Sequence, residues 1–273
     1  MADVYRLAEQ FGHAAIAIED VYKFMVEPGA VMRNYRTEKN GFIITTKGHA
    51  TVLFNESPYR LSPGVIAHGA QNMTIDAKVT SRTSWEYYLI LYRLEEDGAN
   101  RDTEIRTHFE LKTGVNPRIQ ELLQMMRKMA NGSDRIRFFR AKALFFDVLY
   151  EVFASCQYCV YRKSQESSIA EAAQFIRAHF SEPLTLAGLA SAQGMTPGSF
   201  SYLFHKYLGI RPMDYITQCR IERARQLLAS TDLPVNEVSM QVGYSDPLYF
   251  SRIFKKHAGL SPSKIYPRTQ SSL

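Results

Sequence analysis

An internal repeat in the last hundred residues limits what this chain can fold into more than any other feature. Each copy places two phenylalanines four residues apart and follows them with a lysine, a glycine and a proline. The residues that recur at an offset of fifty are Phe200 and Phe250, Ser201 and Ser251, Phe204 and Phe254, Lys206 and Lys256, Gly209 and Gly259, and Pro212 and Pro262. A repeat of this kind indicates one supersecondary unit that is present twice.

Prolines and glycines predict where the helices of each unit begin and end. The pairs Thr196-Pro197 and Asp246-Pro247 are typical of an N-cap followed by the first residue of a helix. Two glycines follow short apolar segments, where a helix is expected to end: Gly194 and Gly243. The predicted helices cover residues 185–193, 197–207, 212–229, 235–242 and 247–257. Each copy therefore predicts a helix-turn-helix, in which the second helix can enter the major groove of DNA.

Residues 16–94 show a different pattern, that of short β-strands. Segments rich in β-branched and aromatic residues, such as FIITTK and SWEYYLILYRL, are separated by turn signals that include Asn40-Gly41 and Pro63-Gly64. This spacing predicts a small barrel or sandwich. Both faces of SWEYYLILYRL are apolar, so beyond ordinary core packing one face could line a cavity or meet a helix.

Helical spacing of apolar residues replaces the strand pattern after Gly98. It predicts helices over 117–130 and 134–163, which could form a dimer interface or serve as core. The polar segment RKSQESS predicts a linker at 164–168. The apolar stretch 138–160 carries four charged side chains, so we expect a soluble helix and no membrane span; they are Arg140, Lys142, Asp147 and Glu151.

Charge and cysteine content limit the compartment and the partners. The formal net charge of +6 permits an anionic partner without requiring one. Three cysteines cannot form a disulfide framework, and the N-terminus lacks the apolar core of a signal peptide. We therefore expect a cytoplasmic protein.

Residues 169–267 resemble the DNA-binding domain of the AraC/XylS family of transcription regulators. The segments that carry the resemblance are LAGLASAQGMTPGSFSYLFHKYLGIRPMDYI and VNEVSMQVGYSDPLYFSRIFKKHAGLSPSKIYP. The first half is similar to the sensory domain of that family through YRLSPGVIAH and its overall layout. The resemblance implies an α+β protein with a cupin-like β-barrel and dimerisation helices in residues 1–163. A linker at 164–168 and an all-α DNA-binding domain at 169–268, with two helix-turn-helix motifs joined by a long helix, would follow.

The resemblance also assigns candidate DNA contacts. The recognition helices fall on residues 197–207 and 247–257, and their base-facing candidates are Gly198, Ser199, Ser201, Tyr202, Asp246, Pro247, Leu248 and Arg252. Arg252 is the best candidate for guanine because arginine matches its O6 and N7 edge, with a phosphate contact or an intradomain ion pair as alternatives. The candidate phosphate contacts, which could instead form a solvated face, are His205, Lys206, Lys255 and Lys256. The repeated phenylalanines are expected in the core.

The resemblance also implies that a small-molecule effector enters the N-terminal barrel. The candidate pocket residues are Tyr22, Phe24, Arg33, Tyr35, His68, Trp85 and Tyr87. Arg33 could pair with a carboxylate or phosphate of the effector. The class of effector stays open between a sugar, an aromatic acid and an iron–siderophore complex.

We therefore expect a homodimeric, effector-controlled activator that binds double-stranded DNA and, as the resemblance implies, RNA polymerase. No catalytic residue, cofactor or metal is expected, because His68 has no His-x-His partner motif and no nucleophile–base pair is evident. Cys156 and Cys159 are interpreted as buried apolar thiols. The alternatives are a cupin-type enzyme fused to a DNA-binding domain and a dimeric regulator that senses no ligand.

Overall fold

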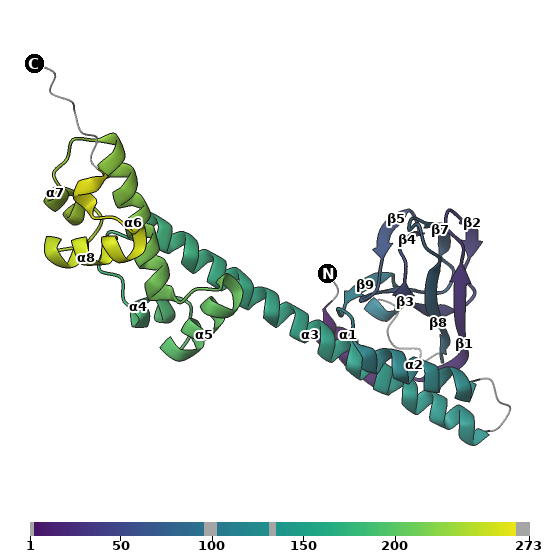
Figure 1. Cartoon of the computed structure of the whole chain (residues 1–273). Coiled ribbons are helices and arrows are strands. Elements are labelled where there is room, and N and C mark those ends of the chain that lie inside the picture. The colour runs from purple at the N-terminus through teal and green to yellow at the C-terminus, as the bar shows by residue number, and fades with distance from the viewer. Residues whose placement is uncertain (1–2, 96–102, 131–134, 266–273) are drawn as a thin grey trace, which may run out of the picture. The chain divides into compact units, whose positions relative to one another are not determined.

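The computed structural model describes residues 3–95, 103–130 and 135–265. These residues divide into two compact units, Met1–Tyr161 and Arg162–Leu273. All the described strands lie in the first unit, and the second is helical (Figure 1). The last residues of the predicted DNA-binding domain, 266–268, lie outside the described part of the chain.

The first unit contains two antiparallel sheets. The larger sheet has the order β1 (Ile16–Val26), β8 (Trp85–Leu94), β3 (Asn40–Lys47), β6 (Val65–Gly69) and β9 (Phe109–Lys112). The smaller sheet has the order β2 (Val31–Arg36), β7 (Thr74–Val79), β4 (Ala50–Phe54) and β5 (Ser57–Leu61). The predicted α+β class is confirmed, and the described strands form two separate sheets, the sandwich of the two predicted alternatives, rather than one closed barrel. Alternating side chains look the same in a sandwich and in a barrel, so sequence alone does not decide closure.

The larger sheet buries both of its faces. One face packs on the smaller sheet through Ile43, Ala67 and Trp85. The opposite face, which includes Phe42 and Tyr92, packs on helices α1 (Val4–His13), α2 (Pro117–Ala130) and α3 (Arg135–His179). A short 3-10 helix, η1 (Glu104–Arg106), adds Ile105 to that core. This double burial explains why β8 is apolar on both sides.

The segment predicted as a linker, residues 164–168, is helical, because it lies within the single run of α3 from Arg135 to His179, shortly after the boundary between the two units. Glutamine and glutamate in this segment are good helix formers, and neither glycine nor proline interrupts it, so its polarity marks exposure to solvent rather than a break in the helix. Among the described helices, only the segment Ile136–His179 is long and apolar enough to cross a membrane. Its residues Phe145, Val148 and Val152 are buried in the core of the first unit, as in the core helix of a globular domain.

The second unit contains two helix-turn-helix motifs around helix α6. The first motif consists of α4 (Leu186–Ala192) and α5 (Pro197–Leu208), and the second of α7 (Val235–Gln241) and α8 (Pro247–Ala258). Helix α6 (Pro212–Ser230) lies between them in the chain, and a 3-10 helix, η2 (Pro262–Lys264), ends the described part. Each motif has its own core, to which α6 contributes Ile216 for the first and Ile221 and Leu228 for the second. The core positions predicted for the repeated phenylalanines are confirmed, since all four are fully buried: Phe200, Phe204, Phe250 and Phe254.

Candidate functional site

The turn of each motif is built by a capped helix and a left-handed glycine. The Thr196 side chain accepts a hydrogen bond from the Ser199 amide at 3.3 Å, and the Asp246 carboxylate accepts from the Leu248 amide at 2.8 Å. Gly194 and Gly243 have φ values of 63° and 88°, a region that favours glycine. These local features position α5 and α8 as the exposed second helix of each motif.

The predicted DNA-contact residues lie on the outer faces of these helices. Tyr202 is 66% exposed and Leu248 is 71% exposed, which leaves two large side chains uncovered. Half-buried positions are taken by Ser201 and Pro247, and exposed positions by Gly198, Ser199, Asp246 and Arg252. The four candidate phosphate contacts are also exposed: His205, Lys206, Lys255 and Lys256. Each motif therefore presents a surface that a DNA groove could cover.

Two of the candidates for base contacts have other partners. The Asp246 carboxylate also accepts from the Tyr249 amide at 3.2 Å, so it serves as the cap of α8. The Thr196 hydroxyl donates to Ser199 Oγ at 3.0 Å. By contrast, Arg252 forms no ion pair with any described residue, so the alternative of an intradomain ion pair is not observed for it.

Arg220 on α6 is a structural residue that the sequence analysis did not single out. Its Nε donates to the Phe180 carbonyl at 2.6 Å, and a terminal nitrogen donates to the Glu182 carbonyl at 2.8 Å. Its guanidinium also lies over the ring of Tyr244, 5.2 Å from the centroid. No local pattern distinguishes it from Arg223, which lies three residues away on the same helix.

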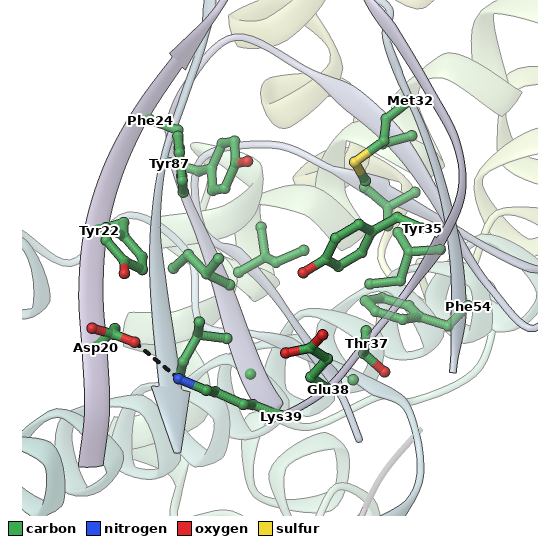
Figure 2. Close-up of a pocket in the computed structure, with 18 of the residues that line it drawn as sticks. Asp20, Tyr22, Phe24, Met32, Tyr35, Thr37, Glu38, Lys39, Phe54 and Tyr87 are labelled. Carbon is green, nitrogen blue, oxygen red and sulfur yellow. Dashed lines mark hydrogen bonds and ion pairs between the residues drawn. The ribbon is translucent and has the colours of Figure 1, made fainter. Parts of the chain in front are cut away.

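A cavity of about 500 Å³ lies within the two-sheet part of the first unit. Five of the seven predicted pocket residues line it: Tyr22, Phe24, Tyr35, Trp85 and Tyr87. Figure 2 shows Tyr22, Phe24 and Tyr87 on one side of this space and Met32 and Tyr35 on the other. Further lining comes from apolar residues of both sheets, among them Ile43, Val52, Phe54, Ile75 and Leu89.

Four aromatic rings form a continuous wall along β8 and β1. The ring centroids are 4.0 Å apart between Trp85 and Tyr87, 5.3 Å between Tyr87 and Phe24, and 5.7 Å between Phe24 and Tyr22. Burial raises the pKa of Tyr87 to about 12. Its phenol is therefore neutral at physiological pH, and the wall offers flat apolar surface with hydroxyl groups attached.

The polar end of the cavity is built by residues that the sequence analysis missed. The ammonium group of Lys39 lies 3.0 Å from carboxylate oxygens of both Asp20 and Glu19, and Figure 2 shows the bond to Asp20. Glu19 and Asp20 raise the pKa of Lys39, so its charge is retained. Asp20, Glu38 and Lys39 line the cavity, which gives the lining one more carboxylate than ammonium group. Lys39 and Glu38 lie in the turn between β2 and β3, where no periodic pattern marks a site.

The structure contradicts the placement of His68 in the pocket. This side chain is fully buried on the opposite face of the larger sheet, where Nδ1 lies 2.9 Å from the Thr107 carbonyl and Nε2 lies 2.8 Å from the Tyr92 hydroxyl. Burial lowers the pKa of His68 to about 3. Its neighbour Ala67 faces the smaller sheet, and alternation then turns His68 towards the helices. The prediction failed because the alternating pattern does not show which face of the strand lines the cavity and which face packs on the helices.

Arg33 is also misplaced by the sequence analysis. It is exposed and does not line the cavity, whereas Met32 and Tyr35 on the same strand do. Alternation counted from Tyr35 puts Arg33 on the cavity side, but the register of β2 shifts between Met32 and Tyr35. A bulge in β2 therefore reverses the expected face.

Of the two cysteines at 156 and 159, the buried one does not form a reactive thiolate at physiological pH. Cys156 is buried in the core of the first unit, and burial raises the pKa of its thiol to about 12. Cys159 is half-buried rather than buried as expected. In the part of the chain that the structure describes, no three side chains of the metal-binding types gather into a metal site.

Comparisons with known proteins find a matching family for each of the two units. Residues 27–149 match the family model described as an AraC-like ligand binding domain, and residues 189–267 match a helix-turn-helix domain model. The chain is 27% identical to the lactose operon transcription activator of Staphylococcus xylosus. The aligned region of 240 residues covers 83% of each protein.

Two further matches each cover less than two fifths of the chain. Over 101 residues the chain is 37% identical to the arabinose operon regulatory protein of Escherichia coli, covering 37% of this chain and 35% of that protein. The solved C-terminal domain of AraT, a response regulator from Geobacillus stearothermophilus, is 34% identical and covers 38% of this chain and 91% of its own, with a TM-score of 0.36. With both family models matched in order along the sequence, this chain belongs to the AraC/XylS family of transcription regulators, with a ligand-binding domain followed by a helix-turn-helix DNA-binding domain.

Proposed function

We propose that this protein is a transcription activator controlled by an uncharged, polyhydroxylated small molecule, a sugar, that binds in the cavity of the first unit. The observation that carries this proposal is the lining of the cavity, where an aromatic wall stands beside carboxylates. Aromatic faces stack on the C–H surface of a sugar ring, and carboxylates accept hydrogen bonds from its hydroxyl groups.

The charges of the lining disfavour the two other effector classes. An aromatic acid or an anionic siderophore complex requires a cationic partner, but Lys39 is held by two carboxylates and Arg33 lies outside. Burying a second anion near Asp20 and Glu38 without compensation is costly. The names of two relatives, which refer to lactose and arabinose operons, support the same choice.

The activator role and the homodimer extend beyond the family assignment. Phe139, Phe146 and Tyr150 recur at spacings of seven and four on α3 and share one side of the helix. Phe139 is 74% exposed and Tyr150 is 70% exposed, an arrangement suited to a second copy of the same helix. In this proposal the dimer places two DNA-binding units on one operator, and the bound activator contacts RNA polymerase.

A titration of the full-length protein with lactose, D-galactose, L-arabinose and D-xylose tests the effector class. Trp85 is the single tryptophan of the chain and lines the cavity, so its fluorescence reports on occupancy. We expect one of these sugars to change the fluorescence, to raise the melting temperature and to be recovered unchanged. Stabilisation by benzoate or a ferric siderophore, with no response to any sugar, would contradict the proposal. Conversion of the sugar would instead support the cupin-type enzyme.

A further inference from the structure

We infer that Asp76, which lies outside the cavity, is a positioning residue that determines which side chains of β2 face the effector. The inference rests on the proposed function in that the effector is taken to bind in this cavity. Asp76 lies on β7 of the smaller sheet and does not line the cavity itself. Its effect would reach the effector through the neighbouring strand.

The register between β2 and β7 shows a bulge directly opposite Asp76. Met32 pairs with Ala77 and Tyr35 pairs with Ile75. Two residues of β2, Arg33 and Asn34, therefore face the single residue Asp76. This two-against-one arrangement is a β-bulge, which bends a strand and changes the direction of its side chains.

The Asp76 carboxylate holds this bulge in place. It accepts a hydrogen bond from the Asn34 amide at 2.7 Å. Asn34 has a φ of 54°, a left-handed conformation that asparagine tolerates better than most residues. A bulge interrupts the backbone ladder, so a side-chain acceptor provides the amide with a partner that the opposite strand no longer offers.

The bulge determines the lining of one side of the cavity. Met32 and Tyr35 are three residues apart and would point to opposite faces of a regular strand. Both line the cavity, and Figure 2 shows both side chains directed into it. Slippage of β2 by one residue to remove the bulge would place Arg33 beside Tyr35 on the cavity face. By holding the bulge, Asp76 keeps a sulfur-containing apolar side chain in the cavity and a guanidinium out of it.

Asp76→Ala, Asp76→Asn and a matched control test this inference in the full-length protein. Asparagine retains an oxygen that can accept from the Asn34 amide, whereas alanine does not. The control is Asn55→Ala, which removes a bond of the same kind at the edge of the same sheet. This bond joins the Thr74 amide, at the start of β7, to Oδ1 of Asn55 in the turn between β4 and β5, at 2.9 Å. Asn55 does not line the cavity.

Two quantities are measured for each variant. They are the affinity for the panel sugar that binds the wild type and the rate of hydrogen exchange of the Asn34 amide. We expect Asp76→Ala to weaken sugar binding by at least about tenfold and to speed exchange at Asn34. We expect Asp76→Asn to remain within about threefold of the wild type in affinity. Asn55→Ala should leave both readouts unchanged while lowering the unfolding midpoint as much as Asp76→Ala does.

The result that overturns the inference is wild-type affinity and wild-type exchange for Asp76→Ala. Equal weakening of sugar binding by Asp76→Ala and Asn55→Ala also overturns it, because the role of Asp76 would then be that of any bond in the sheet. If no panel sugar binds the wild type, the proposed effector class fails by itself. Exchange at Asn34 in Asp76→Ala then decides alone whether the carboxylate holds the bulge.

Discussion

Arg220 lies over the ring of Tyr244, with 5.2 Å between the guanidinium carbon and the ring centroid. The same side chain donates to the carbonyls of Phe180 and Glu182. One residue of α6 thus joins the segment that follows α3 to the turn of the second helix-turn-helix motif. Tyr244 itself is 8% exposed and belongs to the core of that motif.

Removal of this guanidinium is expected to destabilise the second unit. Arg220→Ala removes the donor to the Phe180 carbonyl, leaves the Glu182 carbonyl with the Leu184 amide alone, and uncovers one face of Tyr244. We therefore expect a loss of about 2–3 kcal/mol in the free energy of unfolding. Arg220→Lys should recover less than half of this free energy. A single ammonium group cannot donate to both carbonyls and also lie flat over the ring, as the planar guanidinium does. Urea unfolding of the full chain measures the loss. The control is Arg223→Ala, which removes an exposed side chain that donates to Gln226 three residues along the helix, and an equal loss there would contradict the assignment.

The two turn glycines should differ in their tolerance of alanine. Both have positive φ, so alanine costs about 1–2 kcal/mol at either position. At Gly194 an added Cβ meets no atom within 4 Å, whereas at Gly243 it collides with the backbone carbonyl of Ser181. We expect Gly194→Ala to lower the free energy of unfolding by the conformational cost alone. Gly243→Ala should lower it by at least about 3 kcal/mol. Thermal unfolding compares them, and equal losses would show that the contact with Ser181 relaxes freely.

Buried His68 should make the first unit sensitive to acid. Its pKa is about 3 in the folded protein, compared with about 6.5 for an unfolded histidine. Between these values the unfolded chain binds the proton and the folded protein does not. The free energy of unfolding therefore falls as the pH drops below about 6.5, by up to about 1.4 kcal/mol per pH unit from this residue.

His68→Gln removes this titration and gives the test. Its unfolding free energy should be lower than that of the wild type at pH 7 because hydrogen bonds of the ring are lost. The difference between the two proteins should then narrow as the pH falls from 6.5 to 4.5. A difference that stays constant over this range would mean that His68 is protonated in the folded protein.

Arg252 and Lys256 are expected to play different parts on DNA. Arg252→Ala should cost about 1–3 kcal/mol of operator affinity and relax specificity at one base pair. Lys256→Ala should weaken binding to all sequences alike and lower the slope of log affinity against log salt by about one. Gel-shift titrations on operator and random DNA at several salt concentrations separate the two effects. Equal losses on both DNAs for both variants would show that the roles are wrongly assigned.

The helices of the second unit could be predicted almost to the residue because their ends are encoded locally. For α5 and α8, proline at the first helical position, a polar cap before it and a left-handed glycine after the last residue define both ends without help from the rest of the fold. The capping role of Asp246 was predicted from its place before Pro247 and is confirmed. The role of Arg220 was not, because its partners at 180, 182 and 244 are distant in the sequence.

The cavity could be predicted only in part because tertiary contacts decide its faces. Alternation placed Trp85 and Tyr87 correctly, but it could not say that His68 faces the helices. Arg33 was misplaced because the bulge depends on a carboxylate 42 residues away in the chain. Lys39 was missed because a turn residue has no period from which to infer its direction.

Selection of genomic DNA fragments on the full-length protein tests the central claim most directly. Fragmented DNA of the source organism is captured at near-physiological salt, with and without each sugar of the panel. We predict that a few fragments are enriched and that one sugar changes the strength of their enrichment. Diffuse, salt-sensitive retention with every sugar and without any would contradict an effector-controlled, sequence-specific regulator.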